Sequence, residues 1–412
     1  MGPGFSPLDE VLELLSGVAF TPWLVESIVR LGALIPFGQV PALLRHFTGV
    51  SVSVATVRRL TETAGAVQEA GETRAVDELE HALPDAPQGP PVQLLSVDGA
   101  MVPLVGGSWA EVKTLAIGTV EAVTPAMGTT TGERPAAPMV QTRELSYFSR
   151  LADTDTFTRL ATIETQRRGT ETARTVVAVT DGARWCQGFI DVQRADAIRI
   201  LDFAHALEHL GQVAQAVYGA GTATASAWLG QQAHALRHGQ TLAVLDRLAA
   251  LAAAPRCGSE VRTLIQQTHV YLATRMEQVR YDVFVAAGYP IGSGCVESAN
   301  KLLVEARLKG SGMHWARDNV NPMLALRALA CNQRWQEAWP TLWQAWRRAV
   351  HDRARQRRQA RRARDQEPPS VVVATPPSAV VVEQPARPKT IVNGKPTKDH
   401  PWRRSAPFPA KR

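Results

Sequence analysis

Three acidic residues could do chemistry together because of where they fall in the chain. Asp98 and Asp181 each end an apolar run and each precedes glycine, in the segments SVDGA and VTDGA. Glu297 follows a Gly-Ser-Gly turn that brings it forward at the start of a helical segment. Aspartate is unfavourable within a strand, and glycine beside it lets another group approach closely. One such aspartate is often a turn former, but two with the same local pattern and a third acid favour a functional site.

Three converging carboxylates would suit Mg²⁺, with Mn²⁺ as a substitute, because hard cations prefer oxygen ligands to the softer set of a zinc site. Two such ions about 3.5–4 Å apart can hold the attacking and leaving oxygens of a phosphoryl transfer. Clustered carboxylates also repel one another, so at least one should bind a proton without metal. We therefore expect Asp98, Asp181 and Glu297 to be both the catalytic and the metal-binding residues.

The elements that must position these acids form an α/β pattern. The first acid lies on a long apolar strand, the second ends another strand, and the third begins a helix, as in an RNase H-like fold. Asp181 and Glu297 are 116 positions apart, which is too long for a loop and predicts a helical insertion. The expected strands are 92–104, 110–120, 143–151, 175–181 and 197–202, with helices at 7–16, 22–31 and 154–169.

Residues 36–65 have the layout of a helix-turn-helix. Gly49 can end a first helix, Ser51 or Ser53 can cap a second, and Arg58 and Arg59 are expected on the exposed face of that second helix. Such a helix enters the major groove of DNA, although a plain helical hairpin would have the same pattern. The apolar residues expected to face inward are Val40, Leu43, Leu44, Phe47, Val54, Val57 and Leu60.

Positive charge is concentrated near the end of the chain. Residues 347–364 hold nine arginines and one aspartate, whereas the first 346 residues carry a net charge of −5. A block of this density attracts phosphate chains, although a solvated helix is the alternative. Before it, Pro340 is expected to start a new helix, and a stripe at helical spacing is expected to pack in the core: Trp335, Trp339, Trp343 and Trp346.

Four segments together resemble a known family. SVDGAMV, VTDGARW, LDFAHALEHL and PIGSGCVESANKLLVEARLKGSGMHW are similar to the DDE transposases of bacterial insertion sequences, specifically the Kra-type group, and the likeness runs from about residue 7 to DHPWRR. The resemblance implies that Asp98, Asp181 and Glu297 are the metal-binding triad. It implies that Asp202 and His205, in an Asp-x-x-His motif, support the site. Members cut DNA at element ends and join the freed 3′-OH to target DNA.

Other residues near these motifs have both a functional and an ordinary interpretation. His205 and His209 could share a metal on one helical face, but without a third soft ligand nearby His205 is expected to support the site and His209 to be an ordinary helix position. Lys301 could face the phosphate or pair with Glu297 or Glu305. Trp315 could stack on a base or lie in the core. Phosphate contacts are expected of Arg307 and Lys309.

Bulk properties exclude some classes of protein. No apolar run reaches the roughly 18 residues that a membrane span needs, and the first residues lack a signal-peptide layout. Four scattered cysteines fit a reduced cytosolic protein, and the resemblance implies a bacterial cytoplasmic, nucleoid-associated one. We expect an N-terminal DNA-binding region (1–80), an RNase H-like catalytic domain (90–205 and 287–346), a helical insertion (206–286) and a basic, largely disordered tail (347–412).

The function predicted from these patterns is DNA strand cleavage and transfer of an insertion sequence. The expected partners are terminal inverted repeats and target DNA, with a homo-oligomer when two ends are paired. A related nuclease such as a junction resolvase would cut without joining. A DNA-binding protein that has lost catalysis is the third possibility, although all three acids are present.

Overall fold

The computed structural model describes residues 20–82, 84–123, 139–255, 258–366, 391–392 and 395–396. The chain divides into two compact units, Met1–Arg355 and Gln356–Arg412. The first unit contains the sheet and the helices around it. The second contains the end of helix α15 (Trp335–Gln366) and a hairpin of β6 (Ile391–Val392) and β7 (Lys395–Pro396). The helix expected at 7–16 lies outside the described residues.

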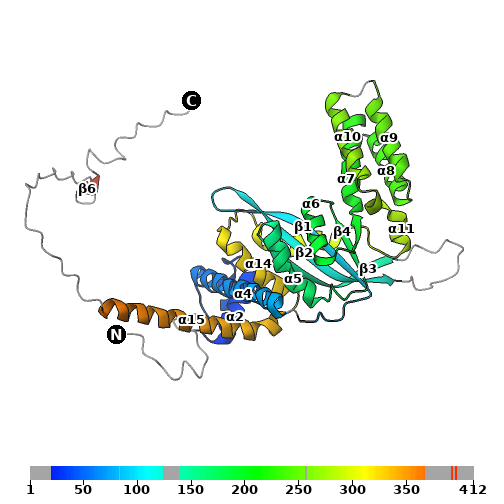
Figure 1. Cartoon of the computed structure of the whole chain (residues 1–412). Helices are drawn as coiled ribbons and strands as arrows, with labels where there is room; N and C mark the ends of the chain where they lie inside the picture. Colours follow the sequence, from blue (N-terminus) through cyan, green and yellow to red (C-terminus); the bar gives the residue numbers. More distant parts are fainter. Residues whose placement is uncertain are drawn as a thin grey trace, which may run out of the picture. The chain divides into compact units, whose positions relative to one another are not determined.

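A five-stranded mixed sheet forms the centre of the first unit, with the order β3-β2-β1-β4-β5. β1 pairs antiparallel with β2, which pairs antiparallel with β3, whereas β1, β4 and β5 run parallel. This α/β arrangement is consistent with an RNase H-like core (Figure 1). The strands fall where the sequence predicts them: β1 (Val92–Pro103), β2 (Trp109–Val123), β3 (Met139–Arg150), β4 (Thr175–Thr180) and β5 (Ile198–Leu201).

Both faces of the sheet are covered because β1 is apolar on both sides. Leu94 and Leu95 point to opposite faces and belong to different buried clusters. On the Leu95 face, α5 (Thr154–Arg167) and α6 (Arg184–Arg194) contribute buried aromatic side chains, while α6 was not expected from the sequence. The other side of the sheet contacts α12 (Gly294–Ala299), the π-helical turn η2 (Asn300–Glu305) and α14 (Arg317–Cys331), and α13 (Ala306–Leu308) continues from η2.

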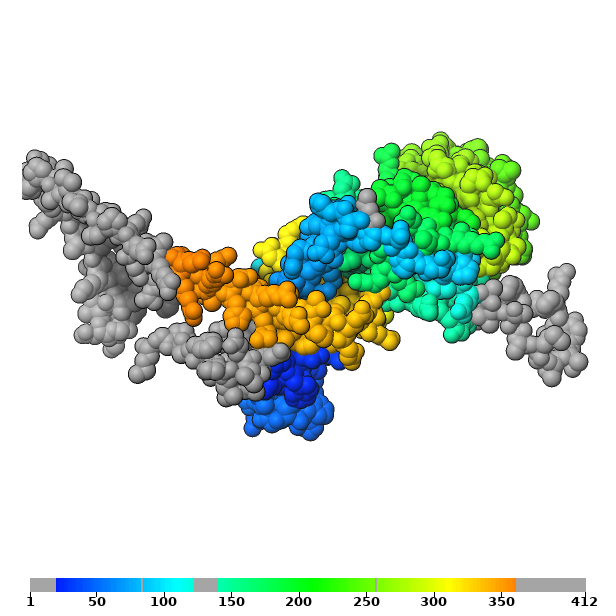
Figure 2. Space-filling model, turned by 60° about the horizontal axis from the view of Figure 1, so that its bottom comes forward, coloured from blue at the N-terminus to red at the C-terminus, as the bar shows by residue number. Residues whose placement is uncertain are grey.

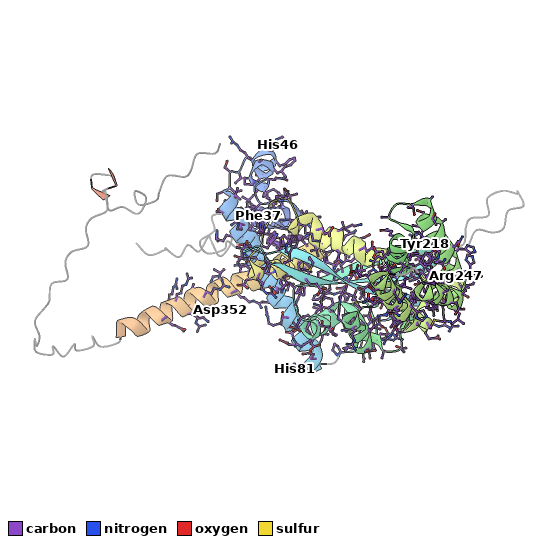
Figure 3. All side chains as sticks on the ribbon, turned by 90° about the horizontal axis from the view of Figure 1, so that it is seen from above. Phe37, His46, His81, Tyr218, Arg247 and Asp352 are labelled. Atoms are coloured by element: carbon purple, nitrogen blue, oxygen red, sulfur yellow. The ribbon has the colours of Figure 1, made fainter. Side chains whose placement is uncertain are left out.

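The chain between β5 and α12 is helical, as expected. It stands out from the sheet as a bundle whose apolar core includes Leu210, Leu248 and Leu272 and continues into buried residues of β1, β4 and β5 (Figure 1). In Figure 3, Tyr218 and Arg247 mark this bundle, well apart from His46 of the N-terminal helices. Its elements are α7 (Phe203–Tyr218), α8 (Ala223–Arg237), α9 (Thr241–Ala253), α10 (Ser259–Ala273), η1 (Met276–Val279) and α11 (Tyr281–Ala286).

Three helices precede the sheet: α2 (Pro22–Leu34), α3 (Val40–Thr48) and α4 (Val54–Ala82). Gly49 ends α3 with a left-handed φ of 73°, and the Ser53 hydroxyl accepts a hydrogen bond from the Thr56 N–H at the start of α4. Both predictions are confirmed. At 29 residues, however, α4 continues far past the turn and its later part packs against α5.

The expected inner faces of α3 and α4 are only partly right. Val40, Leu44, Val57 and Leu60 are buried, but Leu43 and Val54 are exposed. Phe47 is 77% exposed and its ring contacts His46 instead. Helix α3 is only nine residues long, so its last turn extends past the stripe that packs against the neighbouring helices.

The tryptophan stripe lies in the core, as predicted. Trp335 stacks on Trp339 with ring centroids 5.8 Å apart, and Trp339 stacks on Trp343 at 6.0 Å. The stripe packs α15 against the N-terminal helices, and Figure 2 shows the first part of α15 in orange beside their blue surface. The expectation that Pro340 starts a new helix is wrong, because α15 runs through it. Pro340 is the sixth residue of α15, so the helix continues through it without the hydrogen bond that an N–H at this position would donate.

Replacing Trp339 by alanine should destabilise the first unit by about 3–5 kcal/mol, because a large buried side chain is lost between two stacked rings. The midpoint of urea unfolding, followed by far-UV circular dichroism, measures this change. Trp23→Ala, at a side chain that is 64% exposed, is the matched control and should shift the midpoint little. Equal shifts in the two variants would contradict a core role for the stripe.

Candidate active site

Parallel pairing of β1 with β4 brings the first two acids to one edge of the sheet. The register runs from Val92 opposite Thr175 to Leu95 opposite Ala178, and three residues further along each strand come Asp98 and Asp181. The Asp181 carboxylate accepts a hydrogen bond from the Cys186 thiol (3.5 Å), which also contacts the carbonyl oxygen of Val97. Cys186 therefore bridges the residues next to both acids.

The third acid lies on the helix that contacts Asp98. Asn300 follows Glu297 by three positions, and its side-chain amide donates to Asp98 Oδ2 at 2.8 Å. Glu297 itself is exposed, whereas Asn300 is buried at the start of the π-helical turn. Such turns are rare and frequently occur at functional sites. Asp98 is thus connected to the helix that carries Glu297.

The electrostatics of Asp98 show that the three acids share one field. Burial raises the pKa of Asp98, and the negative charges of Asp181 and Glu297 raise it further. Hydrogen bonds from the Gly99 N–H and from Asn300 oppose this shift. Mutual repulsion of this kind is relieved when a divalent cation binds between carboxylates, so the oxygen-only set fits Mg²⁺ chemically.

The side chains are not arranged as a ready-made metal cage. Among the residues that the structure describes, no group of three or more His, Cys, Asp or Glu side chains is placed to hold an ion. Asp98 instead accepts from Gly99 and Asn300, and Asp181 accepts from the Ala183 N–H at 2.8 Å. These hydrogen bonds orient both carboxylates and leave further lone pairs that an ion could use.

The glycines beside the two aspartates do leave room for other groups. A Cβ on Gly99 would clash with the Glu111 carboxylate. Gly182 has a φ of 78°, and a Cβ there would lie 2.6 Å from Arg275 Nε. By contrast, Gly292 and Gly294 lack a left-handed φ and face open space. A tight turn that needs glycine, as expected before Glu297, is therefore not present.

Two residues of the insertion fix the backbone at Asp181 and were missed in the sequence. The Tyr271 hydroxyl donates to the carbonyl oxygen of Asp181 at 2.7 Å, and Arg275 donates to that of Gly182 at 2.9 Å. The Arg275 guanidinium lies over the Tyr271 ring, 4.2 Å from its centroid. Both lie about 90 positions from Asp181, with Tyr271 on α10 and Arg275 in the turn after it, and their spacing of four is the only signal in the sequence.

Asp202 connects the two ends of the insertion. It is only 2% exposed. One carboxylate oxygen caps α7 by accepting from the His205 N–H (3.1 Å), and the other accepts from the N–H (2.7 Å) and the hydroxyl of Ser293. The Phe203 N–H also donates to the carbonyl oxygen of Ile291. The turn that leads to Glu297 is therefore held against the start of α7.

The two histidines lie beside this cap. His205 is partly exposed, with Nδ1 3.3 Å from a Glu208 carboxylate oxygen. Its ring contacts His209, which stacks on Tyr271 with centroids 4.1 Å apart. Burial, followed by the neighbouring His205, lowers the pKa of His209. His209 is therefore more than an ordinary helix position, because it supports the tyrosine that contacts Asp181.

Two residues expected to contact DNA lie in the core. Arg307 is 1% exposed, donates twice to the carbonyl oxygen of Gly32, and packs over the rings of Phe37 and Trp315. Burial lowers its pKa to about 10. The expected phosphate contact of Arg307 is therefore wrong. Trp315 is buried, and its backbone bonds to the end of β1 at Pro103, so the core alternative holds and its ring cannot stack on a base here.

Lys301 and Lys309, the two lysines expected to contact DNA, differ in how exposed they are. Lys309 is half-buried and pairs with Glu305 at 2.8 Å. Lys301 is exposed, four positions after Glu297. Because Glu305 is engaged by Lys309, Lys301 is the better placed of the two to meet a substrate near the acids.

Comparisons with known proteins leave the site to be interpreted from its own geometry. No protein-family model matches the chain, and a search of curated proteins finds no matching sequence. Within the described ranges, no helix is both long and apolar enough to cross a membrane.

Asp202→Asn should release the turn that carries Glu297. Asparagine still caps a helix, but its amide nitrogen cannot accept from Ser293, which leaves a buried donor unpaired at a cost of about 1–3 kcal/mol. Hydrogen exchange of residues 291–297 should therefore become faster. Asp153→Asn, at the exposed cap of α5, is the control. Unchanged exchange in Asp202→Asn would show that the Ser293 contact does not hold the turn.

Asp98→Asn should raise the melting temperature at neutral pH without divalent cations. Because the folded-state pKa of Asp98 is raised, stability from its protonation is present at low pH and is lost as the pH rises through that pKa. The gain over wild type should therefore shrink toward about pH 4. Melting curves between pH 4 and 8 in EDTA measure it.

Two comparisons control this pH series. Asp153→Asn should show the opposite trend, since hydrogen bonds from Thr156 lower the pKa of Asp153. Adding Mg²⁺ should raise the melting temperature of the wild type more than that of Asp98→Asn. A difference between Asp98→Asn and wild type that does not change with pH would contradict the raised pKa.

Proposed function

We propose that this protein is a DDE transposase that cuts DNA at the ends of an insertion sequence and joins the freed 3′-OH to target DNA. The observation that supports this most strongly is that β1 pairs with β4 beside Asp98 and Asp181, while Asn300, on the helical segment that carries Glu297, donates to Asp98 at 2.8 Å. These acids come from a central strand, the end of its parallel neighbour and a helix beyond the insertion. If Asp98 belonged to a structural ion-pair network, cationic side chains would lie beside it. The charged neighbours that affect its pKa are instead the acids Asp181 and Glu297.

The fold supports the same proposal. An acid on the central strand and a second acid beside it agree with the RNase H-like arrangement that the strand order permits. The catalytic domain would then comprise residues 90–205 and 287–346, interrupted by the helical insertion. The quoted sequence motifs fall on these elements, with Asp202 and His205 at the start of α7.

In this proposal the chain's own residues position the acids and the substrate. Asn300 orients Asp98, Tyr271 and Arg275 hold the backbone of the Asp181 turn, and Asp202 holds the turn before Glu297. Two Mg²⁺ ions held by the three acids would neutralise phosphoryl charge and lower the pKa of the attacking hydroxyl. Lys301 would contact the phosphate next to the scissile bond.

DNA is the proposed partner of the N-terminal helices as well. Arg58 and Arg59 are exposed on α4 and would contact the terminal inverted repeats. Pairing two ends would require a homo-oligomer, and the setting would be the bacterial nucleoid. A resolvase-like nuclease is the principal alternative, because it would use the same acids for hydrolysis alone.

Asp98→Ala, Asp181→Ala and Glu297→Gln should each lower DNA cleavage by at least about 100-fold while leaving DNA binding nearly unchanged, because each removes a carboxylate that would hold the divalent ions. Labelled DNA from the regions flanking the coding sequence, incubated with Mg²⁺, provides the assay. Glu277→Gln, at an exposed acid on η1, is the control and should cleave normally.

The products separate the candidate functions. Joined strands support transposition, cuts without joining indicate a nuclease, and a shifted but intact DNA indicates a binding protein. Normal cleavage by any one of the three variants would remove that residue from the triad.

A further inference from the structure

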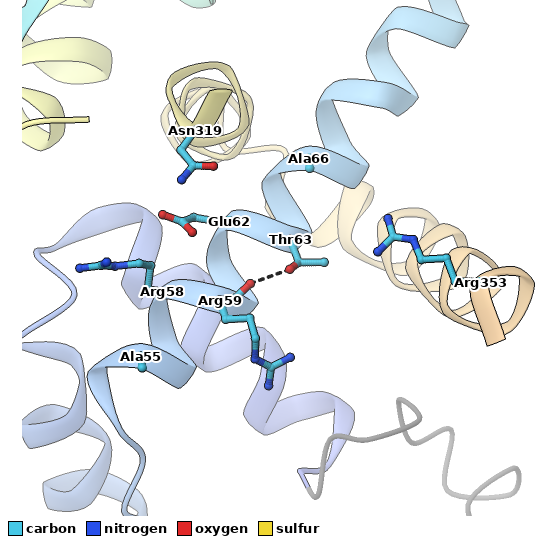
Figure 4. Close-up of a pocket in the computed structure, with 8 residues that line it drawn as sticks. All are labelled: Ala55, Arg58, Arg59, Glu62, Thr63, Ala66, Asn319 and Arg353. Atoms are coloured by element: carbon cyan, nitrogen blue, oxygen red, sulfur yellow. Dashed lines mark hydrogen bonds between the residues drawn. The ribbon is translucent and has the colours of Figure 1, made fainter. Parts of the chain in front are cut away.

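A hollow of about 560 Å³ lies between the N-terminal helices and α15. It is away from the candidate active site and has three arginines and a single acid in its lining. The lining residues are Ala55, Arg58, Arg59, Glu62, Thr63, Ala66, Asn319 and Arg353. Figure 4 shows that they come from three helices: α4, α14 and α15.

The three helices form distinct walls of the hollow. Arg58 and Glu62 lie on the side of α4 where Asn319 of α14 is found, while Arg353 reaches from α15 toward Thr63 (Figure 4). Arg59 leaves α4 on the side away from Asn319. The guanidinium groups are therefore spread along the hollow and do not converge on one point.

Two of these walls are held rigidly together. One turn beyond Glu62, Gly65 of α4 lies so close to the backbone of Pro322 in α14 that an added Cβ would clash with it. The third wall is placed by the tryptophan stripe, whose last member, Trp346, is buried two turns before Arg353. The helices that form the hollow are thus packed parts of the first unit, and they present the arginine side chains at its surface.

The charges of the hollow indicate the chemistry of its ligand. Arg58, Arg59 and Arg353 are exposed, and the guanidinium group matches phosphate geometry. Glu62 is half-buried beside Arg58; burial raises its pKa and Arg58 opposes that shift. An open site with separated cations suits several phosphates in a row better than one small anion.

We infer that the hollow binds the sugar–phosphate backbone of duplex DNA, with Arg58, Arg59 and Arg353 each contacting phosphates and not base edges. This rests on the proposed function only in taking DNA as the substrate. A recognition helix must present its face freely to a major groove about 12 Å wide. Here α14 and α15 flank the turns of α4 that carry Arg58 and Thr63, so a backbone lying between the walls fits better.

The hollow brings together two regions that lie far apart in the sequence. Arg353 belongs to the arginine block of residues 347–364, and Arg58 and Arg59 belong to the expected helix-turn-helix. In the structure they line one site. The basic helix and the N-terminal helices would therefore hold the same stretch of DNA.

Salt-dependent binding of the full-length protein tests this inference. Two duplexes are compared, one from the element end and one with a scrambled sequence. Their affinities are measured for Arg58→Ala, Arg59→Ala and Arg353→Ala in EDTA, which prevents metal-dependent cleavage. Each should weaken binding to both duplexes equally and reduce the slope of log K against log salt by about 1. Glu62→Gln should tighten binding to both. Arg237→Ala, exposed on α8, is the matched control, and circular dichroism checks folding.

Three results would overturn the inference. The first is an unchanged salt slope in Arg353→Ala, and the second is a loss of affinity in Arg58→Ala or Arg59→Ala that is confined to the element-end duplex, which would mean that α4 reads base edges. The third is a loss of affinity for duplex RNA but not for DNA. Strand transfer with Mg²⁺ is assayed separately, so altered binding without any cleavage would reject the transposase and keep the phosphate site.

Discussion

A single buried carboxylate determines where the third acid lies. Asp202 and Ser293 are 91 positions apart, and the helical bundle between them shares its apolar core with one face of the sheet. That packing places the bundle, while the turn that enters α12 is fixed by a separate contact. Asp202 provides this contact by capping α7 with one oxygen and accepting twice from Ser293 with the other. Leaving any of these buried donors unpaired would cost more than the bond itself contributes, which makes the contact specific.

The same bundle acts on the second acid from the opposite direction. Tyr271 and Arg275 donate to consecutive carbonyl oxygens at Asp181 and Gly182, so α10 and α7 both contact the edge of the sheet where the acids gather. The insertion is therefore a structural support for the site as well as a separate subdomain. In the proposed mechanism, this support would hold the negatively charged carboxylates near one another until divalent cations neutralise them.

The sequence predicted the elements better than it predicted which way side chains point. Apolar strands with an acid within them or directly after them, such as β1 and β4, have few alternatives, and all five strands were found. Helical spacing alone could not tell that Arg307 faces Gly32 and not solvent, because the partner is 275 positions away. The prediction that Phe47 faces inward was wrong for a related reason, because the end of a short helix can extend past the helices that it packs against. Tyr271 and Arg275 gave almost no signal, because their role exists only in the folded chain.

The π-helical turn from Asn300 to Glu305 lies between two residues of one helical segment that have different roles. Before it, the helix places Glu297 near the other acids; after it, Arg307 is anchored in the core by Gly32. A π turn holds one more residue than an α turn would, and each residue of a helix turns the chain by about 100°. Losing one residue between 300 and 305 would thus shorten the π turn to an α turn and leave the directions of Glu297 and the buried arginine unchanged. Losing one residue from a regular α-helical turn would instead rotate Glu297 by about 100° about the helix axis.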